Sequence, residues 1–170
     1  MKKTKKIIFL SILTSIAIIL SIIDKMITPL AFPMLPTAKI GLANIIVLLV
    51  IYRFGFKETI LVVVIKIIIA NLLFGSLTAV IIGGSASFLS FLSMFLIYKV
   101  FKEKVSAIGI SVVGGFIHIM VQLLVTMTIY QLGDVVMYYG AILVFVSLIC
   151  SIIIGVIVNK LKSYLLKMQF

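Results

Sequence analysis

Six long runs of apolar residues, separated by short polar or glycine-containing segments, dominate the pattern along this 170-residue chain. Runs of about 20 apolar residues are long enough to cross the hydrocarbon core of a bilayer as helices. The pattern therefore predicts an all-α membrane protein: six transmembrane helices in one integral membrane domain that covers residues 1–170. The predicted spans are residues 7–23, 40–53, 58–73, 77–101, 105–130 and 136–158.

Prolines and glycines mark the predicted interruptions of this pattern. Pro29, Pro33 and Pro36 all fall between the first two runs. Because proline breaks regular helices, we expect the first helix to end at Asp24-Lys25 and residues 26–38 to form an apolar loop on the outer side. The pair Gly83-Gly84 is expected to interrupt the fourth helix.

Basic residues gather at alternate boundaries between the runs. Four clusters hold twelve of the 15 Lys and Arg residues: Lys2, Lys3, Lys5 and Lys6; Arg53 and Lys57; Lys99, Lys102 and Lys104; Lys160, Lys162 and Lys167. The remaining boundaries hold only Lys25 and Lys39. Because cytoplasmic loops are enriched in Lys and Arg, this alternation predicts that both termini lie in the cytoplasm.

Composition supports a membrane protein and explains the charge. The chain is 64% hydrophobic, whereas ordinary soluble domains are roughly 45–50% apolar. Its net charge of +11 comes from basic residues that gather on one predicted side of the membrane. We therefore expect this charge to set the orientation of the helices and to contact anionic lipids, rather than to bind nucleic acid. A single cysteine, Cys150, excludes an internal disulfide and any site that needs several cysteines.

Lys66 lies near the middle of the third run. A charged side chain at the centre of a span costs about 2.5–3.5 kcal/mol on insertion scales, and it normally faces the bundle interior or a wet cavity. Two interpretations stay open, a contact with an anionic substrate and a specific buried pair inside the protein.

Gly114, His118, Gln122 and Thr126 recur every four residues in the fifth run, which places them on one stripe of a helix. Polar side chains in a lipid-embedded helix face protein or a cavity. The stripe predicts either hydrogen bonds between helices or one wall of a substrate site, with His118 and Gln122 as binding residues. A lone histidine without other ligands at suitable spacing gives no ground for a metal site, so no metal or cofactor is expected.

Lys39, Gly41 and Asn44 lie together at the outer end of the second run. Free N–H groups at a helix start bind anions readily, so these residues are candidates for binding an anionic substrate. The alternative is an interfacial lysine and an asparagine that bonds to a neighbouring helix.

Small residues at four-residue spacing occur at Ser11 and Ser15 and again at Ser147, Ser151 and Gly155. Such residues let helices approach closely. Packing within the protein and docking of a separate membrane subunit both remain open; Ser11 and Ser15 are the docking candidates. The chain has no motif for phosphate binding, a serine nucleophile or magnesium diphosphate, so we do not expect it to be an enzyme by itself.

Four stretches carry a resemblance to a known family: residues 39–45 (KIGLANI), residues 52–58 (YRFGFKE), the pair Gly83-Gly84, and Gly114 to Gln122. Together they resemble the Gx transporter family, also described as heptaprenyl diphosphate synthase component I. That family is similar to the substrate-binding S-components of energy-coupling-factor (ECF) transporters in the bacterial plasma membrane.

The resemblance implies a membrane subunit that captures a small molecule from outside and delivers it through a coupling subunit driven by two ATPases. The loop after the first helix would act as a lid, and Ser11 and Ser15 would match the docking surface. The second family description implies instead a non-catalytic accessory subunit for a prenyl synthase catalytic subunit, in menaquinone synthesis or extracellular electron transfer.

Overall fold

The computed structural model describes residues 3–31, 41–74, 76–131 and 135–167. These residues form six α-helices and one short 3-10 helix. They are α1 (Lys3–Ala31), α2 (Asn44–Arg53), α3 (Phe56–Phe74), α4 (Leu77–Phe101), η1 (Lys102–Lys104), α5 (Ala107–Tyr130) and α6 (Val135–Lys167). The predicted all-helical class is confirmed, and Leu77–Phe101 coincides with the predicted range. α4 and α5 begin where serine hydroxyls cap them: Ser76 accepts from the amide of Ala79, and Ser106 from that of Gly109.

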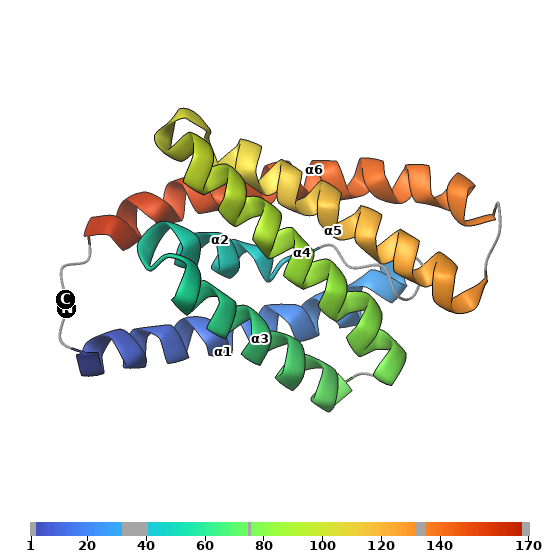
Figure 1. The fold of residues 1–170 in the computed structure, drawn as a ribbon, viewed down its shortest axis with the longest axis horizontal. Helices are drawn as coiled ribbons and strands as arrows, with labels where there is room; N and C mark the ends of the chain where they lie inside the picture. Colours follow the sequence, from blue (N-terminus) through green and yellow to red (C-terminus); the bar gives the residue numbers. More distant parts are fainter. Residues whose placement is uncertain (1–2, 32–40, 75, 132–134, 168–170) are drawn as a thin grey trace.

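The short helix α2 forms the centre of the bundle. All eight residues from Asn44 to Ile51 are buried, and α2 packs against each of the other five helices. Its 10 residues span about 15 Å at the usual helical rise, half the thickness of a bilayer core. It is therefore an internal helix, which lies among the other helices of the bundle (Figure 1).

Among the described residues, four segments are long and apolar enough to cross a membrane: Lys3–Thr28, Leu77–Phe101, Ala107–Tyr130 and Gly140–Leu165. α3 is not among them, because its 19 residues include Lys57, Glu58 and Lys66. By length and composition alone, four described segments can therefore span a membrane, and the six predicted spans are not confirmed.

The start of α1 and the end of α6 lie at the same end of the bundle, as do the α2–α3 and α4–α5 connections (Figure 1). The described members of the four basic clusters occur at these element ends, so the fold brings them together; we call this the basic end. Lys2 lies outside the described residues. The tight α2–α3 connection passes through Gly55 with a φ of +93°, a conformation that favours glycine.

Two predicted helix ends and one predicted interruption are wrong. α1 continues beyond Asp24-Lys25 to Ala31, through Pro29, because both polar residues have partners inside the protein instead of ending the helix. Pro33 and Pro36 lie outside the described residues. α4 is continuous across Gly83-Gly84. A Cβ atom on Gly84 would lie 3.2 Å from Ile67 of α3, so this glycine permits close packing rather than a break. At the far end of the chain, α6 extends beyond the predicted limit of 158.

Candidate binding site in the polar interior

The buried side chains that carry a charge, an amide or an imidazole lie toward the half of the bundle opposite the basic end, together with three buried hydroxyl side chains. The other buried hydroxyl side chains lie elsewhere in the bundle. The side chains of the first set belong to the second half of α1, the start of α2, the second half of α3, the first half of α4, and the middle and second half of α5; Figure 1 shows where these helices lie. They are Asp24, Thr28, Asn44, Lys66, Asn71, Ser87, His118, Gln122 and Thr126. Burial of so many polar groups among apolar helices is costly unless they bind one another or a ligand, so this interior is the candidate site.

The start of α2 is held by a carboxylate from α1. The backbone N–H of Gly41 donates to Asp24 Oδ2 at 2.8 Å, and Asp24 is only 3% exposed. Gly41 has a φ of +89° and leads into the first turn of α2. In that turn the backbone N–H of Asn44 donates to the Gly41 carbonyl at 2.9 Å. Thr28 Oγ1 donates to the Asp24 carbonyl at 2.6 Å. The sequence predicts that N–H groups at the start of α2 are available to an anionic ligand. In the structure, the Gly41 N–H donates to the carboxylate of Asp24 instead. Lys39 lies outside the described residues.

Lys66 is buried, as its position in the third run predicts, with 3% exposure. It lines a small cavity between α1, α3 and α4 together with Lys25, which sequence analysis treated as a boundary residue. Lys25 Nζ donates to the Ala70 carbonyl at 2.7 Å and to Asn71 Oδ1 at 2.9 Å. Two lysines from different helices therefore share one cavity. The sequence contains only a weak sign that Lys25 faces the interior. Ser21, inside the first apolar run, lies one helical turn before it and so on the same face of the helix.

The α5 stripe is buried, as predicted. His118 is 4% exposed and Gln122 2% exposed, on a helix that packs against α4 and α6 and also contacts α2. One member of the stripe takes part in a bond between helices, since Ser90 Oγ of α4 donates to the Gly114 carbonyl at 2.8 Å. The Thr126 hydroxyl has no hydrogen-bond partner among the described residues. Among all the residues that the structure describes, no group of three or more His, Cys, Asp or Glu side chains could hold a metal.

Ser11 and Ser15 lie on the outside of α1, where Ser15 Oγ donates to the Ser11 carbonyl at 3.0 Å. They line an apolar groove of about 300 Å³ between α1 and α3, whose other lining residues include Leu10, Leu61 and Ile65. Both serines are exposed on the surface of the bundle.

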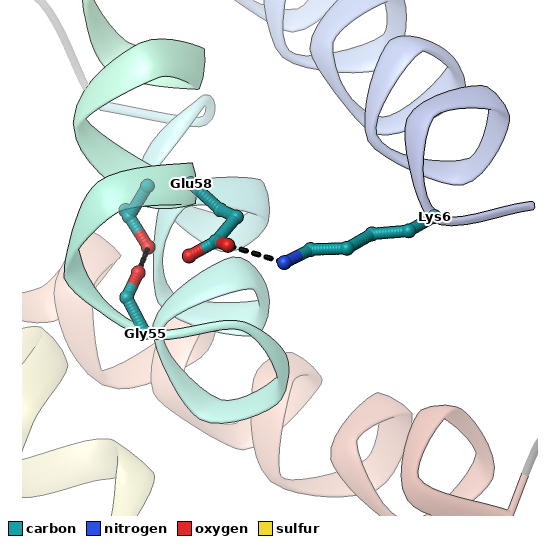
Figure 2. A network of polar contacts seen from close by, with 4 residues as sticks. Lys6, Gly55 and Glu58 are labelled. Atoms are coloured by element: carbon teal, nitrogen blue, oxygen red, sulfur yellow. Dashed lines mark hydrogen bonds and ion pairs between the residues drawn. The ribbon is translucent and has the colours of Figure 1, made fainter. Parts of the chain in front are cut away.

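At the basic end, the side chain of Lys6 forms an ion pair with Glu58 in the first turn of α3 (Figure 2). In the same turn Thr59 Oγ1 donates to the Gly55 carbonyl at 2.6 Å. The hydrogen bond from Lys6 holds the pKa of Glu58 below its ordinary value. This contact fastens α1 to α3 at one end, while the Lys25–Asn71 contact fastens the same helices near the other.

Fold and site together define a helical membrane protein with a buried, lysine-containing polar interior. A family model described as heptaprenyl diphosphate synthase component I matches residues 13–161. The chain belongs to this family, as its sequence motifs indicate. No curated protein and no solved structure matches the chain.

Proposed function

We propose that this protein is the non-catalytic, substrate-binding subunit of a small-molecule uptake system of the energy-coupling-factor type. It lies in the bacterial plasma membrane with its basic end toward the cytoplasm, as cytoplasmic enrichment in Lys and Arg favours. The observation that carries the proposal is the burial of Lys66 at 3% exposure among apolar helices. A charged amine buried within a membrane span costs several kcal/mol. A role in binding a substrate would explain why the protein contains it.

The preferred substrate is a small anionic molecule, such as a carboxylate. It would bind in the half of the bundle opposite the basic end, between the start of α2 and the polar faces of α3 and α5. Asn44, Lys66, His118 and Gln122 are its proposed contacts within the described residues, and all four are buried there. Gly41 would shape the start of α2 through its bond to Asp24 rather than bind the substrate directly.

The decisive experiment is an untargeted search for metabolites that copurify with the detergent-solubilised protein. We expect wild type to retain an anionic small molecule and Lys66→Met to lose it. Lys57→Met is the matched control, because Lys57 is an exposed lysine at the other end of the same helix. Retention of the same molecule by Lys66→Met would contradict the assigned site.

Active uptake also needs a partner, because the chain has no nucleotide-binding motif. We propose that the α1–α3 groove, with Ser11 and Ser15, receives a helix of a coupling subunit that is associated with two ATPases. Small side chains on an exposed helix face allow such close approach. Replacing both serines with Leu should abolish copurification of that subunit and leave ligand retention unchanged. Ile12→Phe with Ile16→Phe is the control, since these exposed residues do not line the groove.

A second candidate function is favoured by the family description. A component of a heptaprenyl diphosphate synthase would be a membrane accessory subunit that associates with a prenyl synthase catalytic subunit. This function predicts that the purified protein retains only isoprenoids or quinones and captures a prenyl synthase subunit. Either result in the two experiments above would replace the transport proposal.

A further inference from the structure

The cavity that contains Lys25 and Lys66 lies between three helices and has a polar lining. Its lining residues include the hydroxyl groups of Ser21 and Ser87 and the amide side chain of Asn71. Its volume is about 20 Å³, enough for one water-sized group. It can therefore admit one oxygen of a carboxylate or phosphate, or a small inorganic anion, but not a whole metabolite.

Lys25 is held in a position that leaves a donor for this cavity. A protonated lysine has three N–H donors. Two of them have acceptors in the Ala70 carbonyl and Asn71 Oδ1. Asn71 is itself fixed by its bond to the Ile67 carbonyl at 2.8 Å. The ammonium group is thus oriented by α3, and among the contacts of the described residues its third donor remains for a ligand.

The charges around the cavity favour an anion. Asp24 is the one buried carboxylate among the described residues, and its Oδ2 accepts the Gly41 amide. Even if Asp24 balances one of the two lysines, the other contributes a positive charge in excess. Electrostatic interactions are strong in a low-dielectric interior, so an anionic group that enters the cavity is stabilised by both amines.

We propose that Lys25 and Lys66 form an oxyanion subsite that binds the carboxylate or phosphate group of the transported molecule, with Asn71 as the residue that positions Lys25. This inference rests on the proposed function for the identity of the ligand, but not for the binding of an anion. The hydroxyl groups of Ser21 and Ser87 lie at the same cavity and are suited to donate hydrogen bonds to the bound oxygen.

The test is the thermal stability of the purified full-length protein titrated separately with acetate and with inorganic phosphate. Sodium and ionic strength stay constant, with the same bulky sulfonate buffer anion as the balance in every sample and its effect alone as the reference. Ligand that binds only the folded state raises the melting temperature with concentration. We expect this rise for wild type and for Lys160→Met, an exposed control at the basic end. The stronger of the two anions identifies the group as carboxylate or phosphate.

Lys25→Gln keeps a hydrogen-bond donor but removes the charge, and it should weaken anion binding by about tenfold or more. Lys66→Met should do the same; if that variant fails to fold, the half-buried Lys25 still tests the proposal. Absence of an anion effect in wild type, or an equal effect in Lys25→Gln, would overturn it and leave a cavity filled with water. Anion binding without any retained metabolite would refute the proposed function alone, and a retained metabolite that Lys25→Gln binds normally would refute the subsite alone.

Discussion

The helices α4, α5 and α6 are held together differently from the pair α1 and α3. In the first group small residues bring the backbones into contact. A Cβ atom on Gly155 would lie 2.5 Å from the Ile108 Cα of α5, and one on Gly115 would lie 1.7 Å from Ser151 Oγ. Ser147 Oγ donates to the Gly115 carbonyl at 3.2 Å. These helices leave no space for another side chain at their crossings.

Besides apolar packing, α1 and α3 are joined by polar contacts that lie toward the two ends of the pair. Lys6 binds Glu58 near the basic end, and Lys25 binds Asn71 toward the other. Between them lies the apolar groove of about 300 Å³. Small-residue packing of the α4–α6 kind fixes a geometry, whereas separated polar contacts with an open groove leave surface for a neighbour. We therefore call α4–α6 the rigid part, on the ground of this close packing, and the α1–α3 groove is the surface that the proposed partner would use.

The largest loss of stability is expected from Gly155→Ala, which adds a methyl group where α6 crosses α5 in the rigid part. The nearest atoms to the new Cβ are the backbone of Ile108 and the Ala107 carbonyl oxygen, and backbone cannot rotate away. We expect a loss of about 3 kcal/mol, the upper end for overpacking, measured by thermal unfolding in detergent with circular dichroism. Gly84→Ala is the control because its Cβ meets only the side chain of Ile67 at 3.2 Å. Similar losses in both variants would refute the distinction between the two kinds of contact.

A smaller loss of stability is expected from Asp24→Ala, which removes a polar contact made by α1. It leaves the buried N–H of Gly41 without its acceptor, and such a loss costs about 1–3 kcal/mol. Asp24→Asn keeps an acceptor oxygen and should lose less than Asp24→Ala in the same unfolding measurement. If Asn and Ala behaved alike, the carboxylate would not be holding the start of α2 through this bond.

Much of the fold follows from the sequence, because hydrophobic runs and basic clusters are local signals. Six helices in the predicted order, and the limits of α4, could be read from them. The length of α1 could not. Asp24 and Lys25 look like a helix end, and only contacts with Gly41, 17 residues away, and Asn71, 46 residues away, show why the helix continues. Partners so distant along the chain leave no trace in local periodicity.

The candidate site was predicted in part for the same reason. Burial of Lys66, His118 and Gln122 followed from single polar residues inside long apolar runs, a signal that needs no knowledge of neighbours. Lys25 was missed because a lysine at a span boundary has the same appearance as a topology signal. Its role depends on which helix packs beside it, and the pairing of α1 with α3 is a tertiary property.

The smallest effect concerns the Lys6–Glu58 ion pair, which lies at the basic end and outside the cavity (Figure 2). Glu58 belongs to the first turn of α3, outside the four segments that can cross a membrane. The hydrogen bond from Lys6 lowers the pKa of Glu58 relative to about 4.3 in the unfolded chain. Its stabilisation is therefore fully present above that pH and is lost as the pH falls through the lower folded value.

Glu58→Gln should cost less than about 1 kcal/mol at neutral pH, because Lys6 is 38% exposed and solvent screens the pair. The melting temperatures of wild type and Glu58→Gln should differ at neutral pH and converge in acid, and high salt should also reduce the difference. Lys6→Gln is the matched variant, and the double variant should lose no more than either single one. A difference that is independent of pH would mean that the carboxylate charge does not fasten α1 to α3, and that the groove between them is held open by packing alone.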